Sequence, residues 1–372
     1  MKILILNDVF AHPITNRATY HKWLHELIKG AINIGSPTAQ VVQIHEEKAA
    51  NFKVFSTSAY EVLTGDKLDR AKEHLRRIIL KYDIIISIEG TKVMRKFLKE
   101  LNCQYILIYF SPIRFDKDVY FSVEFSSDEI GKKMEAFSIP EDYFFNLANY
   151  WKCLINEKEK PLTIPQNSAL LIGQVSKDLS VWNGSEMLNL SYYEKSICEI
   201  KKRHSSILFK PHPLDKSSNI SFIKRLSYVS KTDINIYRLL ACNCITEVFA
   251  ISSSVVEEAR FWRTKSTYLF EPFFNENKTF NTFGSSLFSS SFWKMVFNHD
   301  VRLTPGSLDD RFFIRNFRNM YWSYPYLSSL NMELPRLKKG KRDKRKISWH
   351  IKRFFKSLGK ILSPCNESYE KN

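Results

Sequence analysis

The stretch DIIISIEGTKVMRKFLKELNCQYILIYF, residues 83–110, holds two short apolar runs on either side of a segment with helical spacing. Runs this continuous fit strands that are buried on both faces of a parallel sheet, and we expect such strands at 83–89 and 104–110. Between them, residues 91–101 place apolar side chains three and four positions apart, as an amphipathic helix does. The stretch therefore predicts a strand–helix–strand unit with a right-handed crossover.

The same alternation continues on both sides of this unit. Further strands are expected at 2–6, 39–45, 168–173, 206–210, 246–252 and 266–270. Further helices are expected at 17–30, 66–82, 190–204, 219–229, 254–263 and 307–322. Residues 156–168 are polar, contain two prolines and lack periodicity, which is typical of a linker. The pattern predicts an α/β protein with two facing Rossmann-like domains, 1–160 and 161–330, a cleft between them, and a tail, 331–372.

Composition excludes several classes of protein. The 372 residues are 44% hydrophobic, enough to form two cores, and the six scattered cysteines show neither metal-binding spacing nor a disulfide framework. No apolar run reaches the roughly 18 residues that span a bilayer, and MKILILNDVF turns polar too early for a secretory signal. The glycine motifs of dinucleotide-binding folds and P-loop ATPases and the nucleophile elbow of α/β-hydrolases are missing. We expect a soluble cytoplasmic protein with no metal and no other cofactor.

The formal net charge of +17 is concentrated in the tail. Residues 336–360 carry twelve Lys and Arg against one acid, Asp343, which leaves a net charge of only +6 for the rest of the chain. On a helical wheel one face is apolar, formed by Ile347, Ile351, Phe354, Phe355, Leu358, Ile361 and Leu362. Six basic side chains flank or oppose that face: Arg345, Lys346, Lys352, Arg353, Lys356 and Lys360. The pattern predicts a helix that binds an anionic membrane surface, with no nucleic-acid partner. A nucleic-acid-binding or merely solubilising tail is the alternative.

The residues just after each strand are the candidates for function, because open α/β sheets bind ligands beyond the carboxyl ends of their strands. Asp178 lies in LLIGQVSKDLSVWNG, directly after the first strand of the second half, in a loop that also holds Gln174. It is either the cap of the next turn or a carboxylate that acts as nucleophile or base. His212 follows another strand in LFKPHPLD, next to Lys210. This corner is either an incidental surface turn or a donor to a phosphate or carboxylate.

Two further strand ends carry polar side chains. Ser252, Ser253 and Ser254 close one strand and open the helix SVVEEARFW, either as ordinary N-caps or as hydroxyls and N–H groups for a phosphate. Glu257 and Glu258 follow, and either acid complements the helix dipole or binds ribose hydroxyls. In the first half, Glu89 ends an apolar strand and precedes Gly90. It is either a helix N-terminal acid or a general acid or base close to a ligand.

Taken together, GQVSKDLSVWNG, FKPHPLD and ISSSVVEEA with TYLFEP resemble the retaining β-Kdo transferases of bacterial capsule and O-antigen assembly. The resemblance covers mainly residues 168–275, where the motifs occur in order. A looser similarity joins the chain to bacterial sialyltransferases. Residues 1–160 share only the architecture, apart from Glu89-Gly90, and Ile88 stands where sialyltransferases often have a second acid.

The resemblance implies a GT-B fold and a transferase that uses a CMP-activated acidic sugar as donor. Asp178 would be the nucleophile and Glu89 the general acid/base. The donor-binding set would be Gln174, Lys210, His212, Ser252, Ser253, Ser254 and Glu257. The acceptor would be a glycan or lipid-linked glycan, and the enzyme would lie on the inner face of the bacterial cytoplasmic membrane.

Three alternatives remain at this point. An inverting sialyltransferase would use Glu89 to deprotonate the acceptor and would leave Asp178 a structural role. A polyol-phosphate transferase of capsule synthesis has similar HP turns and basic surfaces. A nucleic-acid or membrane adaptor would depend on the tail alone and would bind no CMP.

Overall fold

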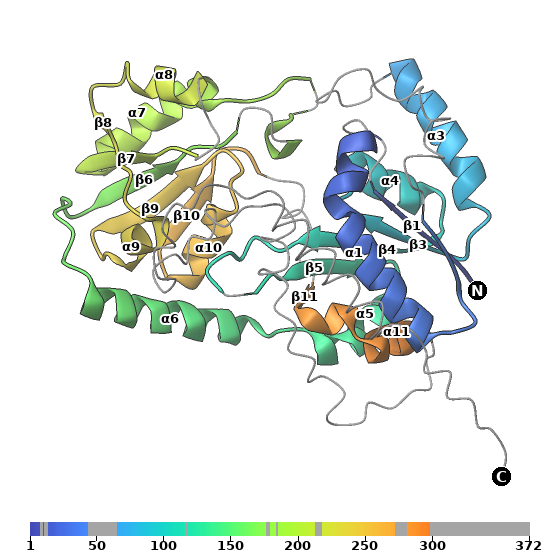
Figure 1. Cartoon of the computed structure of the whole chain (residues 1–372). Helices are drawn as coiled ribbons and strands as arrows, with labels where there is room; N and C mark the ends of the chain where they lie inside the picture. The colour runs from blue at the N-terminus through green and yellow to red at the C-terminus, as the bar shows by residue number, and fades with distance from the viewer. Residues whose placement is uncertain are drawn as a thin grey trace, which may run out of the picture.

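The computed structural model describes residues 1–7, 10, 14–43, 65–116, 118–175, 179–183, 185–212, 218–271 and 281–297. Its strands are β1 (Lys2–Asn7), β2 (Gln40–Gln43), β3 (Ile84–Ile88), β4 (Gln104–Phe110), β5 (Phe121–Phe125), β6 (Ser168–Ile172), β7 (Ser206–Lys210), β8 (Val229–Lys231), β9 (Ile245–Ala250), β10 (Lys265–Tyr268) and β11 (Asn281–Phe283). Its α-helices are α1 (Ile14–Gly35), α3 (Gly65–Ile79), α4 (Lys92–Glu100), α5 (Asp128–Met134), α6 (Glu141–Lys158), α7 (Glu194–Arg203), α8 (Ser218–Ile223), α9 (Ile236–Ala241), α10 (Val255–Phe261) and α11 (Ser290–Phe297). Figure 1 shows these elements gathered into two α/β halves.

The first half is built on a sheet with the strand order β11-β5-β4-β3-β1-β2. Strands β4, β3, β1 and β2 run parallel to one another. At one edge, β5 pairs antiparallel with β4, and β11 pairs antiparallel with β5. Side chains alternate between the two faces along each strand, and the middle strand β3 is buried on both faces. Ile84 and Ile86 pack with α1, α5 and α11, whereas Ile85 and Leu107 pack with α3 and α4.

The second half is built on an entirely parallel sheet with the order β10-β9-β6-β7-β8. Ala169 and Leu171 of β6 pack with α7 and α8, and Leu170 and Ile172 pack with α6, α9 and α10. Helices therefore cover both faces, as in a doubly wound sheet. The strand order reverses between β6 and β9, since the chain leaves β6 towards β7 and leaves β9 towards β10.

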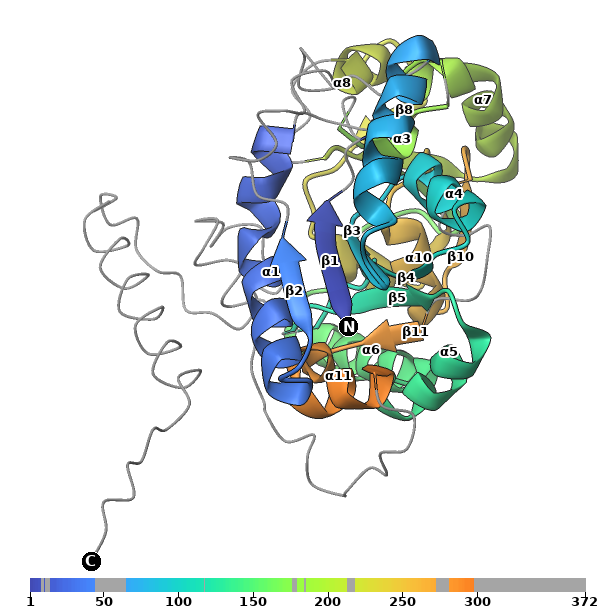
Figure 2. The same ribbon diagram turned by 90° about the vertical axis from the view of Figure 1, so that its right-hand side faces the viewer.

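Residues 281–297 lie with the first sheet, although they follow the second sheet in sequence. β11 pairs with the outer edge of β5, and α11 packs against α1 (Figure 2). The Trp293 side chain is fully buried there, and its indole N–H donates to the carbonyl of Leu287 at 2.9 Å. The first half is therefore completed by residues from the range that we had expected to belong to the second domain, 161–330.

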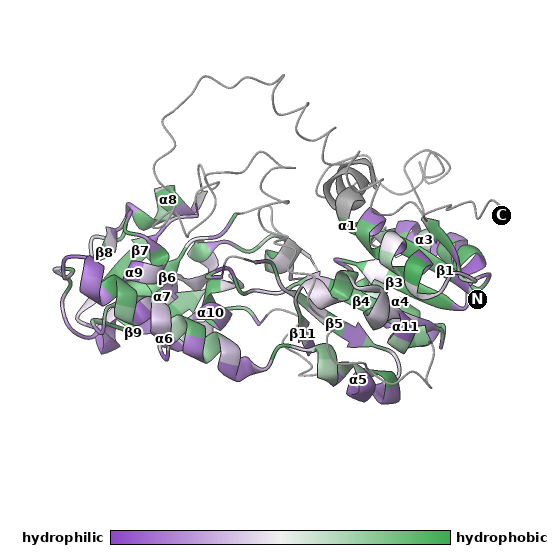
Figure 3. Cartoon of the chain, turned by 60° about the horizontal axis from the view of Figure 1, so that its bottom comes forward, coloured by the Kyte–Doolittle hydropathy of each residue, from purple (hydrophilic) through white to green (hydrophobic). Residues whose placement is uncertain are grey.

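The two halves share a core at their junction. The loop after β4 inserts Phe115, which is fully buried, between side chains of the second half. Its ring centroid lies 5.9 Å from that of Trp262 and 6.2 Å from that of Tyr237. Helix α6 begins near the first half and extends beneath the second half (Figure 1), where its buried side chains pack with α9, α10 and β6. It alternates hydrophilic and hydrophobic residues (Figure 3), as a helix with one buried face does.

The strands that the apolar runs predicted are all present among the described residues, each within two residues of the expected ends. The predicted helix at 307–322 lies outside the described residues, as does the whole tail, and the linker begins only after α6 ends at Lys158. The sequence patterns do not predict β5, β8, β11, α5, α6, α9 and α11. Among the described helices, none is both long and apolar enough to cross a membrane.

Candidate functional site

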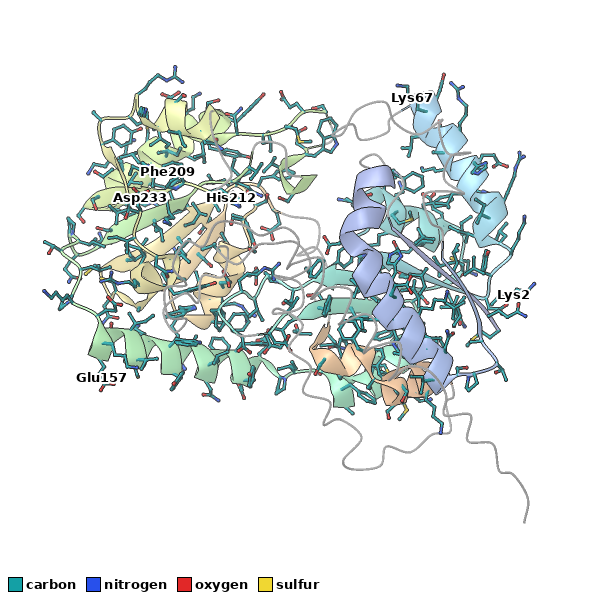
Figure 4. All side chains as sticks on the ribbon, viewed as in Figure 1. Lys2, Lys67, Glu157, Phe209, His212 and Asp233 are labelled. Atoms are coloured by element: carbon teal, nitrogen blue, oxygen red, sulfur yellow. The ribbon has the colours of Figure 1, made fainter. Side chains whose placement is uncertain are left out.

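Three of the segments singled out from the sequence follow neighbouring strands of the second sheet. Strand β6 lies between β7 and β9, so the residues after these three strands share one edge. The reversal of strand order between β6 and β9 is the kind of point at which open α/β sheets bind ligands. Figure 4 shows His212, beyond β7, nearer to the first half than Phe209 or Asp233. This edge is the candidate functional site.

Gln174 ties the end of β6 to the end of β9. Its side chain is buried, and its Oε1 accepts the backbone N–H of Ser252 at 3.0 Å. Its Nε2 donates to Ser252 Oγ at 3.0 Å and to Ser180 Oγ at 2.5 Å. The Gln174 carbonyl accepts the side-chain amide of Asn219, itself 1% exposed, at 2.9 Å. Both ends of the carboxamide are therefore used within the protein, and the contact with a donor that we expected of Gln174 stays a prediction.

Gly173 brings the turn after β7 against the end of β6. Its N–H donates to the carbonyl of Lys210 at 2.8 Å. A Cβ atom at this position would lie 2.9 Å from the backbone nitrogen of His212 and 3.1 Å from Cα of Pro211. Only glycine lets the two backbones approach this closely. The structure thus brings together the Gly173-Gln174 segment, the HP turn (Lys210 to His212) and Ser252.

Lys210 holds its charge in a partly buried position. Burial lowers the pKa of this lysine below its ordinary value of 10.5, Asp233 opposes the shift, and Lys231 adds to it. A cation that has lost part of its hydration gains more from an anionic partner than an exposed one does. The electrostatics of this corner favour a negatively charged ligand.

The serine turn, Ser252 to Ser254, has one buried and two partly exposed members. Ser252 is 3% exposed and is held by Gln174, as described above. Ser254 is the N-cap residue of α10, but its hydroxyl makes no capping hydrogen bond. Within the part of the chain that the structure describes, the backbone N–H groups of Ser253 and Ser254 meet no acceptor. The turn therefore offers hydroxyl and N–H donors to an anion.

The two acids of α10 differ sharply in their surroundings. Glu257 is partly exposed and pairs with Arg260 at 3.8 Å. Glu258 is 2% exposed, and its Oε1 accepts the backbone N–H of Arg114 at 2.6 Å and the hydroxyl of Tyr237 at 3.0 Å. Glu257 thus remains the candidate for a ribose contact, whereas Glu258 links α10 to the first half, a role that sequence reasoning missed.

Glu89 directly follows β3 and has an unusual backbone conformation. Its φ is +52°, in the left-handed region that costs an ordinary residue roughly 1–2 kcal/mol. Its N–H donates to the carbonyl of Ile108 at 2.9 Å, and its Oε1 accepts the N–H of Phe110 at 2.6 Å. The neighbouring Gly90 is buried against Ser87 and Met94 instead of providing the positive φ. Strain held in place by such contacts is often found at functional sites.

Asp178 lies outside the described residues. In sequence it is flanked by Gln174 and Ser180, whose side chains are hydrogen bonded to each other at 2.5 Å at the candidate site. Its expected role as nucleophile therefore stays a prediction.

Two other buried acids form ion pairs with basic side chains away from this edge. Glu124 pairs with Arg95 at 2.8 Å, and Glu247 pairs with Lys265 at 3.2 Å. Among the described residues, no group of three or more His, Cys, Asp or Glu side chains is placed to hold a metal ion.

No protein-family model matches the chain, and no curated protein matches its sequence. Among solved structures, the chain is similar to the beta Kdo 2,7 transferase of Thermosulfurimonas dismutans KpsC, with 13% identity, 74% of this chain and 81% of that chain covered, and a TM-score of 0.38. The beta Kdo 2,4 transferase of the same KpsC is 14% identical over 65% of this chain and 76% of that one, with a TM-score of 0.36. The E. coli heptosyltransferase WaaC is 12% identical over 81% of this chain and 100% of that one, with a TM-score of 0.27. At these values the likenesses assign neither a family nor an activity to the chain.

Proposed function

We propose that the protein is a GT-B type glycosyltransferase that moves an acidic sugar, Kdo, from a CMP-sugar to a surface-glycan acceptor with retention of configuration. The observation that carries the proposal is the meeting of three motifs at one sheet edge. Gly173 touches the backbone of His212, and Gln174 binds Ser252. These are the segments whose sequences resemble retaining β-Kdo transferases, and they come from three different strands.

The groups at this edge suit a CMP-sugar with an acidic sugar. The donor carries a phosphodiester and a carboxylate, both anionic. Lys210 offers an ammonium group with a lowered pKa, His212 an imidazole, and the serine turn its hydroxyl and N–H groups. Hydrogen bonds of this charge-assisted kind stabilise the phosphate that leaves as negative charge develops on it.

The reaction proceeds in two displacements. An oxygen of the Asp178 carboxylate forms a bond to the anomeric carbon while the bond from that carbon to the phosphate oxygen of CMP breaks. The electron pair leaves with CMP, whose charge Lys210 and His212 stabilise. Glu89 then takes the proton of the acceptor hydroxyl as its oxygen attacks the same carbon and Asp178 leaves. Two inversions restore the original configuration, as in retaining glycosidases.

Binding of free nucleotides tests the donor assignment. Calorimetry should find CMP bound more tightly than UDP or ADP. His212→Ala should weaken CMP binding by about 1.5–3 kcal/mol, the usual size of a lost hydrogen bond to a charged group. The control is His74→Ala, a change on the surface of α3, which should bind CMP as the wild type does. Tighter binding of UDP than of CMP would exclude a CMP-sugar donor.

Turnover of CMP-Kdo tests the mechanism. Asp178→Asn should retain CMP affinity, because the carboxylate contacts the sugar, and should lose several orders of magnitude in turnover, as expected when a nucleophile is removed. Mass spectrometry of the intact wild type with CMP-Kdo and no acceptor should show a sugar adduct at Asp178. Near-normal turnover of Asp178→Asn would remove this residue from the mechanism, and an inverted product would indicate the direct displacement of a sialyltransferase.

A further inference from the structure

The backbone from Phe110 to Arg114, here called the 110–114 strap, is held at its two ends by carboxylates from opposite halves of the molecule. At one end, Glu89 of the first half accepts the N–H of Phe110 at 2.6 Å. At the other end, Glu258 of the second half accepts the N–H of Arg114 at 2.6 Å. Each contact is a short hydrogen bond to a carboxylate acceptor, which is stronger than one between neutral groups if the acid is ionised.

The strap limits the distance between the two acids. Four residues of extended chain span at most about 14 Å, so the two carboxylates lie within about 20 Å of each other. Glu258 is one helical turn from the serine turn, because its N–H donates to the carbonyl of Ser254 at 3.1 Å. The strap therefore connects Glu89 with the element that carries the donor-binding serines.

The second-half end of the strap is rigid. Glu258 is 2% exposed and also accepts the hydroxyl of Tyr237 at 3.0 Å. The Tyr237 ring stacks on Trp262 with centroids 5.5 Å apart, and Phe115, the next residue after the strap, packs edge-on against Trp262. Removal of this carboxylate takes away the acceptor of the Arg114 N–H, so it should release the strap from α10.

We propose that Glu258 is a positioning residue, which acts through the 110–114 strap to set where Glu89 stands relative to the donor-binding serine turn. The inference rests on the proposed function for its chemistry. A general base must lie within hydrogen-bonding reach of the acceptor hydroxyl while the sugar is held by the other half. Glu258 touches neither substrate, and it fixes the distance that the second displacement needs.

Kinetics distinguish positioning from stability. Glu258→Ala should keep CMP affinity within about twofold and lower transfer to the glycan about a hundredfold, the cost of a misplacement of roughly 1 Å. Glu258→Gln should recover much of the activity, because its amide oxygen can still accept the Arg114 N–H. The control is Glu247→Gln. Glu247 is also a buried acid, lies in β9 and contacts Lys265 and Thr267. This substitution should lower the melting temperature without changing kcat.

A double variant tests whether Glu258 works through Glu89. If it does, Glu89→Gln with Glu258→Ala should transfer the sugar no more than about twofold more slowly than Glu89→Gln alone. Losses that multiply would overturn the proposal. Should Glu258→Ala fail to fold, Glu258→Gln takes its place in the double variant, where its smaller loss should likewise not multiply with the loss caused by Glu89→Gln.

Hydrogen exchange tests the strap without any substrate. In the wild type the amides of Phe110 and Arg114 should both be protected, and in Glu258→Ala both should exchange at least about tenfold faster. Faster exchange at Arg114 with unchanged protection at Phe110 would overturn the proposal. A wild-type protein that binds no CMP would contradict the proposed function instead, and the exchange result would still decide whether the strap links the two acids.

Discussion

Gly173 matters because of the side chain that it lacks. A Cβ here would meet backbone atoms of His212 and Pro211, which cannot rotate away as a side chain can. Gly173→Ala should therefore displace the HP turn, destabilise the protein by about 1–3 kcal/mol and weaken CMP binding. Thermal unfolding and calorimetry measure both effects.

The matched control is Gly131→Ala, in the middle of α5, where the nearest heavy atom to a new Cβ is 4.0 Å away. Alanine there should stabilise the protein by up to about 1 kcal/mol through its helix propensity. If Gly173→Ala melts and binds CMP like the wild type, the close approach of the two strand ends is not needed.

Lys210 gives the site a dependence on pH. Burial lowers the pKa of this lysine in the folded protein below 10.5, so at pH values between the two pKa values the unfolded chain binds more protons. Stability contributed by this group therefore rises as pH increases through the folded pKa and levels off near 10.5. We expect Lys210→Met to melt higher than the wild type at neutral pH, and the difference to shrink towards about pH 11.

The same variant should bind CMP more weakly, because the phosphate loses an ammonium partner. Melting curves from neutral to alkaline pH measure the change in stability, and CMP titrations measure the change in affinity. A variant that is less stable than the wild type at neutral pH would contradict a desolvated lysine at this position.

The order of residue types along the strands predicted which segments meet at the candidate site, but it did not distinguish the surroundings of each residue there. Gln174, His212 and Ser252 could be chosen because polar side chains stood directly after apolar strands. Glu257 and Glu258 look alike in the sequence, and only the fold decides which one is buried. One signal was available, since Glu258 shares a helical face with Phe261 and Trp262, three and four positions later.

At the scale of elements, strands in the middle of each sheet were predictable and edge elements were not. β3 and β6 are buried on both faces, so every residue is apolar or small and the run is unmistakable. β5 buries an acid, Glu124, which pairs with Arg95 and interrupts the apolar pattern. β11 has three residues and pairs with a strand far away in sequence, which local patterns do not report.

Helix α11 should contribute to the stability of the first half despite its place late in the chain. Trp293 is fully buried beside α1, with its indole N–H bonded to Leu287. Trp293→Ala should destabilise the protein by about 3–5 kcal/mol, the usual cost of removing a buried aromatic side chain. Chemical denaturation measures this cost.

Leu80→Ala serves as the control, because Leu80 is 63% exposed and its truncation should change stability by no more than about 0.5 kcal/mol. Equal effects of the two substitutions would mean that α11 does not form part of the core of the first half.

At the scale of the whole molecule, charge separates the body of the protein from its tail. We propose that residues 336–362 attach the enzyme to the inner face of the cytoplasmic membrane, with each basic residue near the surface contributing about 1 kcal/mol. A lipid-linked acceptor would make this attachment useful. The full chain should float with anionic liposomes and remain behind with neutral ones, and a truncation after residue 335 should not float. Flotation of the truncated protein would show that the tail is not the anchor.

The return of the chain to its first sheet has a consequence for how the protein is made. The strand that pairs with the outer edge of β5 leaves the ribosome about 160 residues after β5 does, and the helix that covers α1 follows directly behind that strand. At the usual rate of translation this gap lasts roughly 8–30 s. The second sheet, whose strands all lie between residues 168 and 268, emerges complete within that time. The half that is synthesised first is thus the half that is finished last, and until residue 297 emerges it exposes an open strand edge and an uncovered apolar helix face to chaperones and to other nascent chains.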